Sequence, residues 1–342
     1  MDLVSDVISA VRVGQPVSHR VRVSGSWCSR IPSYDGMGFR VVLEGSCWVL
    51  PDDGGAPFTL AAGDVVLLPR GTGHILADSP ADGPTVERAT PFEQWLETNG
   101  LPMTRDAAQS GPVRLQSPGA AGPASGTGPA VEMLCGKYQL DRGRAHPLLA
   151  EIPDIVHLPR RAGGHPELAA AIDLLGREAG ASRCGADVAV PSLLDLLLVY
   201  MVRAWLTQTA ADSHGTARWP VALNDPVVAK ALRLLHESPE APWSNAELAA
   251  RAGVSRATLA RRFTSLVGRA PMAYLTWWRM SRAAALLRDS TDPLDTIARK
   301  VGYSTPFALS HAFNRAFGTT PGRYRAEPAS AGTHLPVGPT AR

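Results

Sequence analysis

The sequence predicts an α+β chain of several domains: an N-terminal β-barrel, connecting helices and a C-terminal all-α domain with two helix-turn-helix motifs. Three observations predict this order. Short strand-like segments punctuated by glycine fill the first part of the chain, two long helical segments follow, and one helical pattern then occurs twice. The expected boundaries are 1–160 for the barrel, 161–215 for the connecting and dimerisation helices, 219–326 for the all-α domain and 327–342 for a disordered tail.

The C-terminal domain carries one residue pattern twice, with the copies 50 positions apart. The matched pairs are Ser255 with Thr305, Leu259 with Leu309, Phe263 with Phe313, Gly268 with Gly318, Pro271 with Pro321, and Tyr274 with Tyr324. A hydroxyl side chain caps the start of a helix, and apolar residues four positions apart form a buried stripe along it. Glycine suits the left-handed turn that ends a helix. Each copy therefore predicts a helix, a tight turn and a second helix with one face in solvent.

Positive charge is concentrated in the same part of the chain. Residues 219–327 hold 15 Lys and Arg against 8 Asp and Glu, a balance of +7, whereas the whole chain carries +3 and the remainder therefore −4. A basic helix-turn-helix domain beside an acidic domain indicates nucleic-acid binding by one end, with the second helix of each motif in the major groove. An ordinary helical bundle could match one such motif by chance. Two copies in register, joined by a helix over 272–288, argue against that alternative.

Three stretches carry a family resemblance: SNAELAARAGVSRATLARRF, APMAYLTWWRMSRAAALLRDS and IARKVGYSTPFALSHAFNRAFGTTPGRYR. They resemble the DNA-binding domain of AraC/XylS-type transcription regulators. The resemblance implies a sequence-specific regulator that binds double-stranded promoter or operator DNA, with RNA polymerase as a further partner. By alignment, the base-reading positions of the family fall on Ala257 and Arg261 in the first copy and on Phe307 and His311 in the second. Ala257 and Phe307 depart from a more polar set, which points to apolar contacts with thymine methyl groups.

The expected DNA surface is the outer face of both second helices. Its residues are Arg256, Ala257, Ala260, Arg261, Arg262, Thr305, Phe307, Ala308, His311, Arg315 and Arg323. Among these, phosphate contacts are expected from Arg256, Arg262, Arg315 and Arg323. A nucleoid-like protein that binds any sequence is the alternative, and it would show no preference among DNA competitors.

The first 160 residues contain short segments of Val, Leu and aromatic residues between glycine turns. These segments are Arg20–Val23, Phe39–Leu43, Cys47–Leu50, Phe58–Leu60, Val65–Leu68 and His74–Leu76. Short strands with such spacing predict a small barrel or jelly roll. From Gly63 to His74 the chain reads glycine, five residues and then Pro-x-Gly-x-x-His, which is similar to the second motif of cupins. The domain as a whole resembles the cupin-type sensor domain attached to some AraC-like regulators.

Neither a metal nor another cofactor is expected in this barrel. In metal-binding cupins the histidine at the position of His74 acts together with a His-x-His pair and a glutamate, but residues 38–45 contain no histidine. One imidazole cannot build a site that needs three or more protein ligands. The same departure weakens the alternative of a cupin-type enzyme, such as a dioxygenase or isomerase with an accessory helical domain. Since no nucleophile–base set replaces the metal site, no catalytic residue is assigned.

The barrel is instead expected to receive a signal. For a small-molecule effector, the candidate contacts facing the interior near the barrel mouth are Arg40, Trp48 and His74. For an oxidant, the candidates are Cys28, close to Arg30, and Cys135, close to Lys137, because a neighbouring cation favours the reactive thiolate. Both cysteines equally fit the role of small buried apolar residues.

Two helices are expected after the barrel, at 166–178 and 191–209. The second is apolar around most of its girth, which predicts burial against the barrel or, as the resemblance favours, a homodimer interface. Its apolar run is broken by Asp195 and Arg203 and is too short to span a bilayer, so no membrane partner is expected.

The start of the chain shows no signal peptide, and 4 cysteines are too few for a disulfide framework, so a cytoplasmic location is expected. Residues 105–130, rich in Gly, Pro, Ala and Ser, are expected to form a flexible loop.

Overall fold

A computed structural model describes residues 3–80, 86, 87, 89–92, 94, 113–115, 130–140, 146–161, 164–179, 184–211 and 218–326. The chain divides into two compact units. The described part of the first comprises residues 3–14, 146–147 and 221–326, and that of the second comprises residues 15–140 and 148–220 with the gaps just given. This division differs from the predicted one, because residues 3–14 group with the C-terminal helices and not with the barrel.

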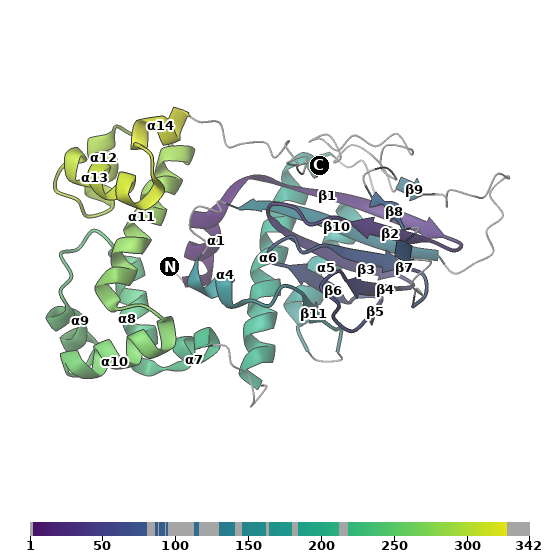
Figure 1. Ribbon diagram of the computed structural model, residues 1–342, viewed down its shortest axis with the longest axis horizontal. Helices are drawn as coiled ribbons and strands as arrows, with labels where there is room; N and C mark the ends of the chain where they lie inside the picture. Colours follow the sequence, from purple (N-terminus) through teal and green to yellow (C-terminus); the bar gives the residue numbers. More distant parts are fainter. Residues whose placement is uncertain are drawn as a thin grey trace, which may run out of the picture. The chain divides into compact units, whose positions relative to one another are not determined.

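The second unit is built on two β-sheets (Figure 1). One sheet has the strand order β11-β6-β3-β10-β1-β9 and the other has the order β5-β4-β7-β2-β8. The strands are β1 Arg12–Ser24, β2 Cys28–Ile31, β3 Met37–Glu44, β4 Ser46–Pro51, β5 Phe58–Ala61, β6 Val65–Leu68, β7 His74–Ala77, β8 Thr90–Pro91, β9 Val113–Leu115, β10 Ala130–Leu140 and β11 Val156–Leu158. This two-sheet architecture agrees with the predicted barrel or jelly roll. Apart from β9, the proposed loop at 105–130 lies almost wholly outside the described residues.

Side-chain alternation along the strands creates the interior between the sheets. Val42 from one sheet and Cys47, Val49 and Leu76 from the other belong to one buried apolar cluster. The opposite face of β4 and β7 holds a separate cluster that includes Ile75. The unpredicted strand β2 contributes Ile31 to the interior, and its two polar residues explain why its sequence gave no strand signal.

Helices cover the other face of the six-stranded sheet. They are α5 Pro166–Glu178 and α6 Ala186–Ala211, of which α5 contacts β3 and α6 contacts both α5 and β11. The helix α6 begins five residues before the predicted start and accommodates Pro191 in its first two turns. Among the described residues it is the one helix long and apolar enough to cross a membrane by length and composition alone. Its contacts with α5 and β11 bury part of this apolar surface within the unit.

The first unit contains both copies of the repeated pattern. Its helices are α1 Leu3–Val11, α8 Pro226–Glu237, α9 Asn245–Ala252, α10 Arg256–Val267, α11 Pro271–Asp289, α12 Leu294–Lys300, α13 Pro306–Phe317 and α14 Pro321–Ala326. Two shorter helices, α4 Pro147–Glu151 and α7 Arg218–Asn224, lie where the chain passes between the units. In the sequence α4 is followed directly by β11. The proposed disordered tail, residues 327–342, lies outside the described residues.

Both predicted helix-turn-helix motifs are present, as α9 with α10 and as α12 with α13 (Figure 1). The Ser255 hydroxyl accepts a hydrogen bond from the Thr258 amide at 3.2 Å, and the Thr305 hydroxyl accepts one from the Ala308 amide at 3.1 Å. In the turns, Gly253 and Gly302 both have φ of 79°, a left-handed conformation that glycine adopts without strain. The capping and turn signals therefore determine the local structure of both copies.

Candidate nucleic-acid interface

The recognition helix of the first copy, α10, presents the predicted residues to solvent. Its inward stripe of Leu259, Phe263 and Val267 is buried, which fixes the rotation of the helix on its neighbours. The outward positions are exposed, namely Arg256, Ala257, Ala260 and Arg261. Within the described part of the chain, Arg261 has neither an ion pair nor a hydrogen-bond partner. A cation on a helix face flanked by small alanines can reach a groove without obstruction.

Arg262 is held by the protein itself. Its guanidinium lies 2.6 Å from the carboxylate of Asp225, whose other oxygen accepts from the amides of Val227 and Val228 and caps α8. The side chain of Asp225 is largely buried and that of Arg262 is half-exposed. The structure therefore places Arg262 in an α8–α10 contact, although the sequence suggested a phosphate contact. The Asp-Pro step before α8, a helix-start signature, was the signal for this capping residue.

The recognition helix of the second copy, α13, carries an aromatic outer face. Phe307 is 87% exposed, the largest exposure among the large apolar side chains of the described residues. His311, Ala308 and Arg315 are exposed on the same helix, and Arg323 is exposed on α14. Apart from Arg262, the sequence-predicted residues of both copies are thus exposed to solvent. A large exposed aromatic ring is unfavourable in water and indicates a surface that becomes covered.

A buried polar chain lies beneath the first copy. His236 of α8 is hydrogen-bonded through Nδ1 to the Asp6 carboxylate at 3.1 Å and through Nε2 to the Tyr274 hydroxyl at 2.8 Å. That hydroxyl is also 3.0 Å from Nε2 of His146. Since a carboxylate only accepts, the Nδ1–H of His236 donates to Asp6 and its Nε2 accepts the Tyr274 proton. Tyr274 then accepts from the Nε2–H of His146, and every member is satisfied.

Burial determines the protonation states of the two histidines and the tyrosine in this hydrogen-bonded series. It lowers the pKa of His236, although the hydrogen bond that His236 donates to Asp6 opposes this shift, and it holds the pKa of His146 well below the ordinary value. It also raises the pKa of Tyr274 well above its ordinary value, and the Asp6 charge adds to that rise. Both imidazoles are therefore neutral at pH 7, as the donor assignment requires. No local sequence pattern predicted this series of hydrogen bonds, because Asp6 and His236 are 230 residues apart in sequence.

The three residues proposed as effector contacts do not all meet. Arg40 and His74 are both buried and are near enough that the Arg40 charge, after burial, helps to lower the pKa of His74 to about 3. Trp48 instead packs with Leu50, Ile75 and Ala77 on the opposite face of its sheet. The interior-facing position expected for Trp48 is therefore wrong, since β4 turns Cys47 and Val49 inward.

The cysteines proposed as redox groups lie in unactivating surroundings. Burial and the charge of Asp78 raise the pKa of Cys28 and outweigh the opposite effect of Arg30. Cys135 is buried inside the sandwich, and burial raises its pKa despite the nearby Arg40. The nearby Lys137 lies 4.8 Å from the ring centre of Tyr34. A raised pKa leaves less thiolate at neutral pH, so the described geometry weighs against the oxidant alternative.

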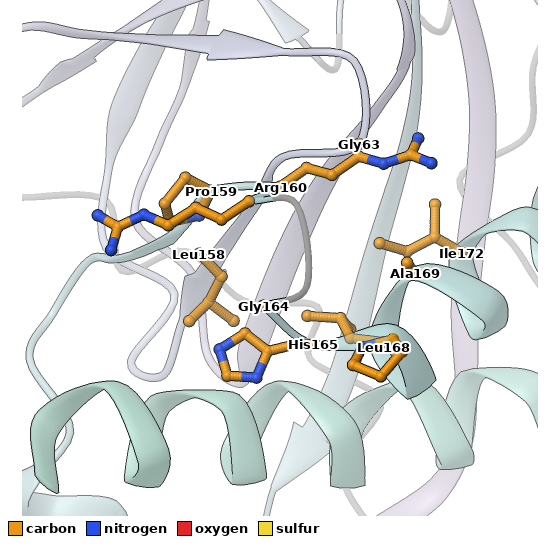
Figure 2. A pocket seen from close by; sticks show the side chains of 11 residues that line it. Gly63, Leu158, Pro159, Arg160, Gly164, His165, Leu168, Ala169 and Ile172 are labelled. Atoms are coloured by element: carbon orange, nitrogen blue, oxygen red, sulfur yellow. The ribbon is translucent and has the colours of Figure 1, made fainter. Parts of the chain in front are cut away.

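A pocket of about 230 Å³ lies outside the sandwich, between the end of β11 and the start of α5. Figure 2 shows Leu158 from β11, His165 just before α5 and Leu168 from α5 lining it. Its basic residues, Arg160 and Arg161, are exposed. Over the part of the chain that the structure describes, no group of three or more His, Cys, Asp or Glu side chains could hold a metal ion.

Comparison with known families agrees with these two architectures. A cupin family profile matches residues 2–207, and a helix-turn-helix domain profile matches residues 248–327. Together with the two capped motifs, they define a DNA-binding transcription regulator that joins a cupin domain to a double helix-turn-helix domain. A putative AraC-like transcription regulator from Streptomyces lividans is 31% identical over 96% of this chain and 99% of its own length. The chain belongs to the AraC-like transcription regulators.

Two further proteins illustrate the extent of the similarity. The HTH-type transcriptional regulator AlkR from Acinetobacter baylyi is 26% identical over 95% of this chain and 99% of its own length. A crystal structure of the DNA-binding domain of AdpA in complex with a target DNA is 38% identical and covers 30% of this chain and 91% of that one, with a TM-score of 0.29.

Proposed function

We propose that α10 and α13 read an operator together and that Arg261 and His311 supply the polar base contacts. Arg261 is exposed and lacks a partner among the described residues, so its guanidinium is available to grip guanine in bidentate fashion. Phe307 contributes apolar contact with thymine methyl groups, and Arg256, Arg315 and Arg323 contact phosphates. The observation that carries this proposal is that both recognition helices are capped and turned so that the same positions of each copy face solvent.

The test is operator binding by the full chain with Arg261→Ala. The substitution should weaken binding to operator DNA by about 1–3 kcal/mol and leave binding to scrambled DNA nearly unchanged, because a base contact is lost. Arg299→Ala is the matched control, since its guanidinium lies 2.9 Å from Asp295 on α12 and is already paired. An unchanged preference between operator and scrambled DNA would contradict the assignment of Arg261 as a base contact. A DNA affinity that does not change with salt concentration would rule out the proposed phosphate contacts.

We also propose that the protein acts as a homodimer through α6. Several apolar side chains of α5 and α6 remain exposed: Val188 at 73%, Leu174 at 44% and Leu196 at 39%. Leu197, which follows Leu196 in α6, is fully buried. Leu196→Asp should therefore yield a folded monomer with weaker operator binding, whereas Leu197→Asp should unfold the cupin unit. Sedimentation and circular dichroism separate these outcomes, and a dimeric Leu196→Asp protein would contradict the proposal.

The cupin unit is proposed to act as the sensor, without enzymatic activity. The relatives named above are transcription regulators, and two of them match nearly the whole chain. The proposed signal is a small molecule that reaches Arg40 and His74, and regulation would follow from changed contact with operator DNA and RNA polymerase in the cytoplasm. A stoichiometric transition metal in the purified protein would instead favour a cupin-type enzyme.

A further inference from the structure

Arg40 points into the interior of the β-sandwich. It lies directly opposite Cys135 in the antiparallel pairing of β3 with β10, and residues opposite one another share a face of the sheet. Cys135 belongs to the interior apolar cluster, as does Val42, two positions after Arg40. Only 5% of Arg40 is exposed. A guanidinium is thus enclosed between two sheets whose neighbouring residues are mostly apolar.

The charge of Arg40 has no anionic partner among the described residues. Its Nη1 donates to the Phe39 carbonyl at 2.8 Å, and its buried Nε has no described partner. By contrast, the half-buried Arg20 is paired with the carboxylate of Glu132. A guanidinium has five donors and keeps its charge at any physiological pH. Burying it without an acid is costly, so the site is incomplete as the chain alone builds it.

A second incomplete polar group comes from the facing sheet. His74, at the start of β7, is fully buried on the same side of its strand as the interior residue Leu76. Its Nδ1 is 2.9 Å from the Thr72 carbonyl and therefore carries the hydrogen, because a carbonyl only accepts. The Nε2 atom is then a bare acceptor, and it has no described partner. It needs a donor, which a carboxylate alone does not supply.

Tyr34 closes the same region. A Cβ at position 38 would overlap its hydroxyl, so glycine at that position, two before Arg40 on the same face, leaves room for the phenol inside the sandwich. Burial raises the pKa of Tyr34, and the neighbouring Arg40 opposes that rise. The cluster of Tyr34, Arg40 and His74 thus combines a fixed positive charge, a phenol and a bare imidazole nitrogen within an apolar interior.

We propose that this cluster binds a small hydroxylated carboxylic acid, with the carboxylate on Arg40 and the hydroxyl donating to Nε2 of His74. The carboxylate supplies the missing negative charge, and the hydroxyl supplies the missing donor. The inference rests on the proposed role of the cupin unit as the sensor and specifies the chemistry of the effector. It assigns specificity to the charge of Arg40 and not to the basic pocket beside α5, whose arginines are solvent-exposed.

The test is calorimetric titration of the full chain, without DNA, with lactate, propionate and lactamide. Lactate should bind saturably, propionate should bind about tenfold more weakly because it lacks the hydroxyl, and lactamide should not bind because it lacks the charge. Arg40→Met should abolish binding, and its unliganded form should be at least as resistant to urea as the wild type, because an unpaired buried charge is removed. Arg30→Met is the control, since that guanidinium is already 2.6 Å from Asp52 at the surface.

Several results would overturn the proposal. These are the absence of binding by both acids, equal binding of lactamide and lactate, and retained binding in Arg40→Met. Unfolding of Arg40→Met would also do so, because it would show that the fold itself satisfies the guanidinium. Equal affinity for propionate and lactate would remove His74 from the site. Because no DNA is present, each of these results leaves the Arg261 test of operator reading untouched, and failure of operator reading leaves the titration interpretable.

Discussion

The two helix-turn-helix copies have equivalent tyrosines with different partners. Tyr274 meets Phe263 edge to face at 5.7 Å between ring centres, and Tyr324 meets Phe313 in the same way at 5.3 Å. The Tyr274 hydroxyl, however, joins the buried chain of two histidines and Asp6, whereas the Tyr324 hydroxyl accepts a hydrogen bond of 3.0 Å from Arg288 in a half-buried position.

The difference continues on the recognition helices. In the first copy Arg262 ties α10 to the cap of α8, and the position 50 residues later is Ala312, a half-buried apolar residue. The second copy relies on aromatic packing instead, with Phe313 and Phe317 stacked at 4.3 Å between ring centres. The comparison teaches that a sequence repeat specifies the motif itself, while the contacts that hold each motif in its domain come from elsewhere in the chain.

Replacing the two tyrosines should separate the copies most strongly. Tyr274→Phe removes the hydrogen-bond partner of two buried Nε2 atoms, those of His146 and His236. It should lower the free energy of unfolding by about 2–4 kcal/mol, since each lost partner costs about 1–3 kcal/mol. Tyr324→Phe, the matched control, should cost less than about 1 kcal/mol because water reaches its neighbourhood. Urea unfolding of the two variants measures both values. Equal losses would mean that the copies do not differ in this way.

Acid should weaken the first copy before the second. Burial keeps the pKa of His236 and His146 below 6.5, so the folded protein holds them neutral while the unfolded chain takes up protons below that pH. The stability of this region is therefore complete above about pH 6.5 and falls below it, by about 1.4 kcal/mol per pH unit for each histidine. Hydrogen exchange should show α8 amides opening as the pH falls from 7 to 5.5. The α13 amides serve as the internal control, because His311 on that helix is exposed. Parallel opening of both would refute the expectation.

The smallest effect is expected at the ion pair of the first copy. Arg262→Met keeps the aliphatic stem and removes the charge opposite Asp225, and it should cost about 1 kcal/mol because the pair is only partly buried. Operator affinity should then change by no more than this loss of stability implies, whereas a phosphate contact would also reduce the salt dependence of binding. Parallel measurements of unfolding and of binding against salt concentration distinguish the two roles. A shallower salt slope would restore Arg262 to the DNA surface.

Local signals were sufficient for the helical motifs. The caps at Ser255 and Thr305, the buried stripes and the turn glycines all depend on neighbours within a few residues, and the structure confirms them. The helix predicted over 272–288 is confirmed as α11. Two-sheet architecture was equally visible in the strand pattern. In each case the residues that specify one helix or one strand lie within a short segment.

Contacts between distant residues explain what the sequence did not predict. The ion pair between Arg262 and Asp225 was not foreseen, and Trp48 was wrongly expected to face inward because the alternation of β4 depends on its partner strands. The unpaired state of Arg40 is likewise a property of the whole interior, because it depends on which acids do not reach it. Such facts depend on the register of distant strands and the packing of distant helices, which no window of sequence contains.

The contact between Asp6 and His236 also has a consequence for the order of folding. A ribosome makes α1 first and makes α8 and α11, the helices it packs against, only after some 230 further residues. At about 5–20 residues per second, the apolar face of α1 waits on the order of 10–50 s for its partners. The cupin unit can fold in that interval, but the unit that contains the DNA-binding helices cannot close until α8 and α11 have been made. Deletion of α1 would therefore damage helices some 230 residues away in the sequence.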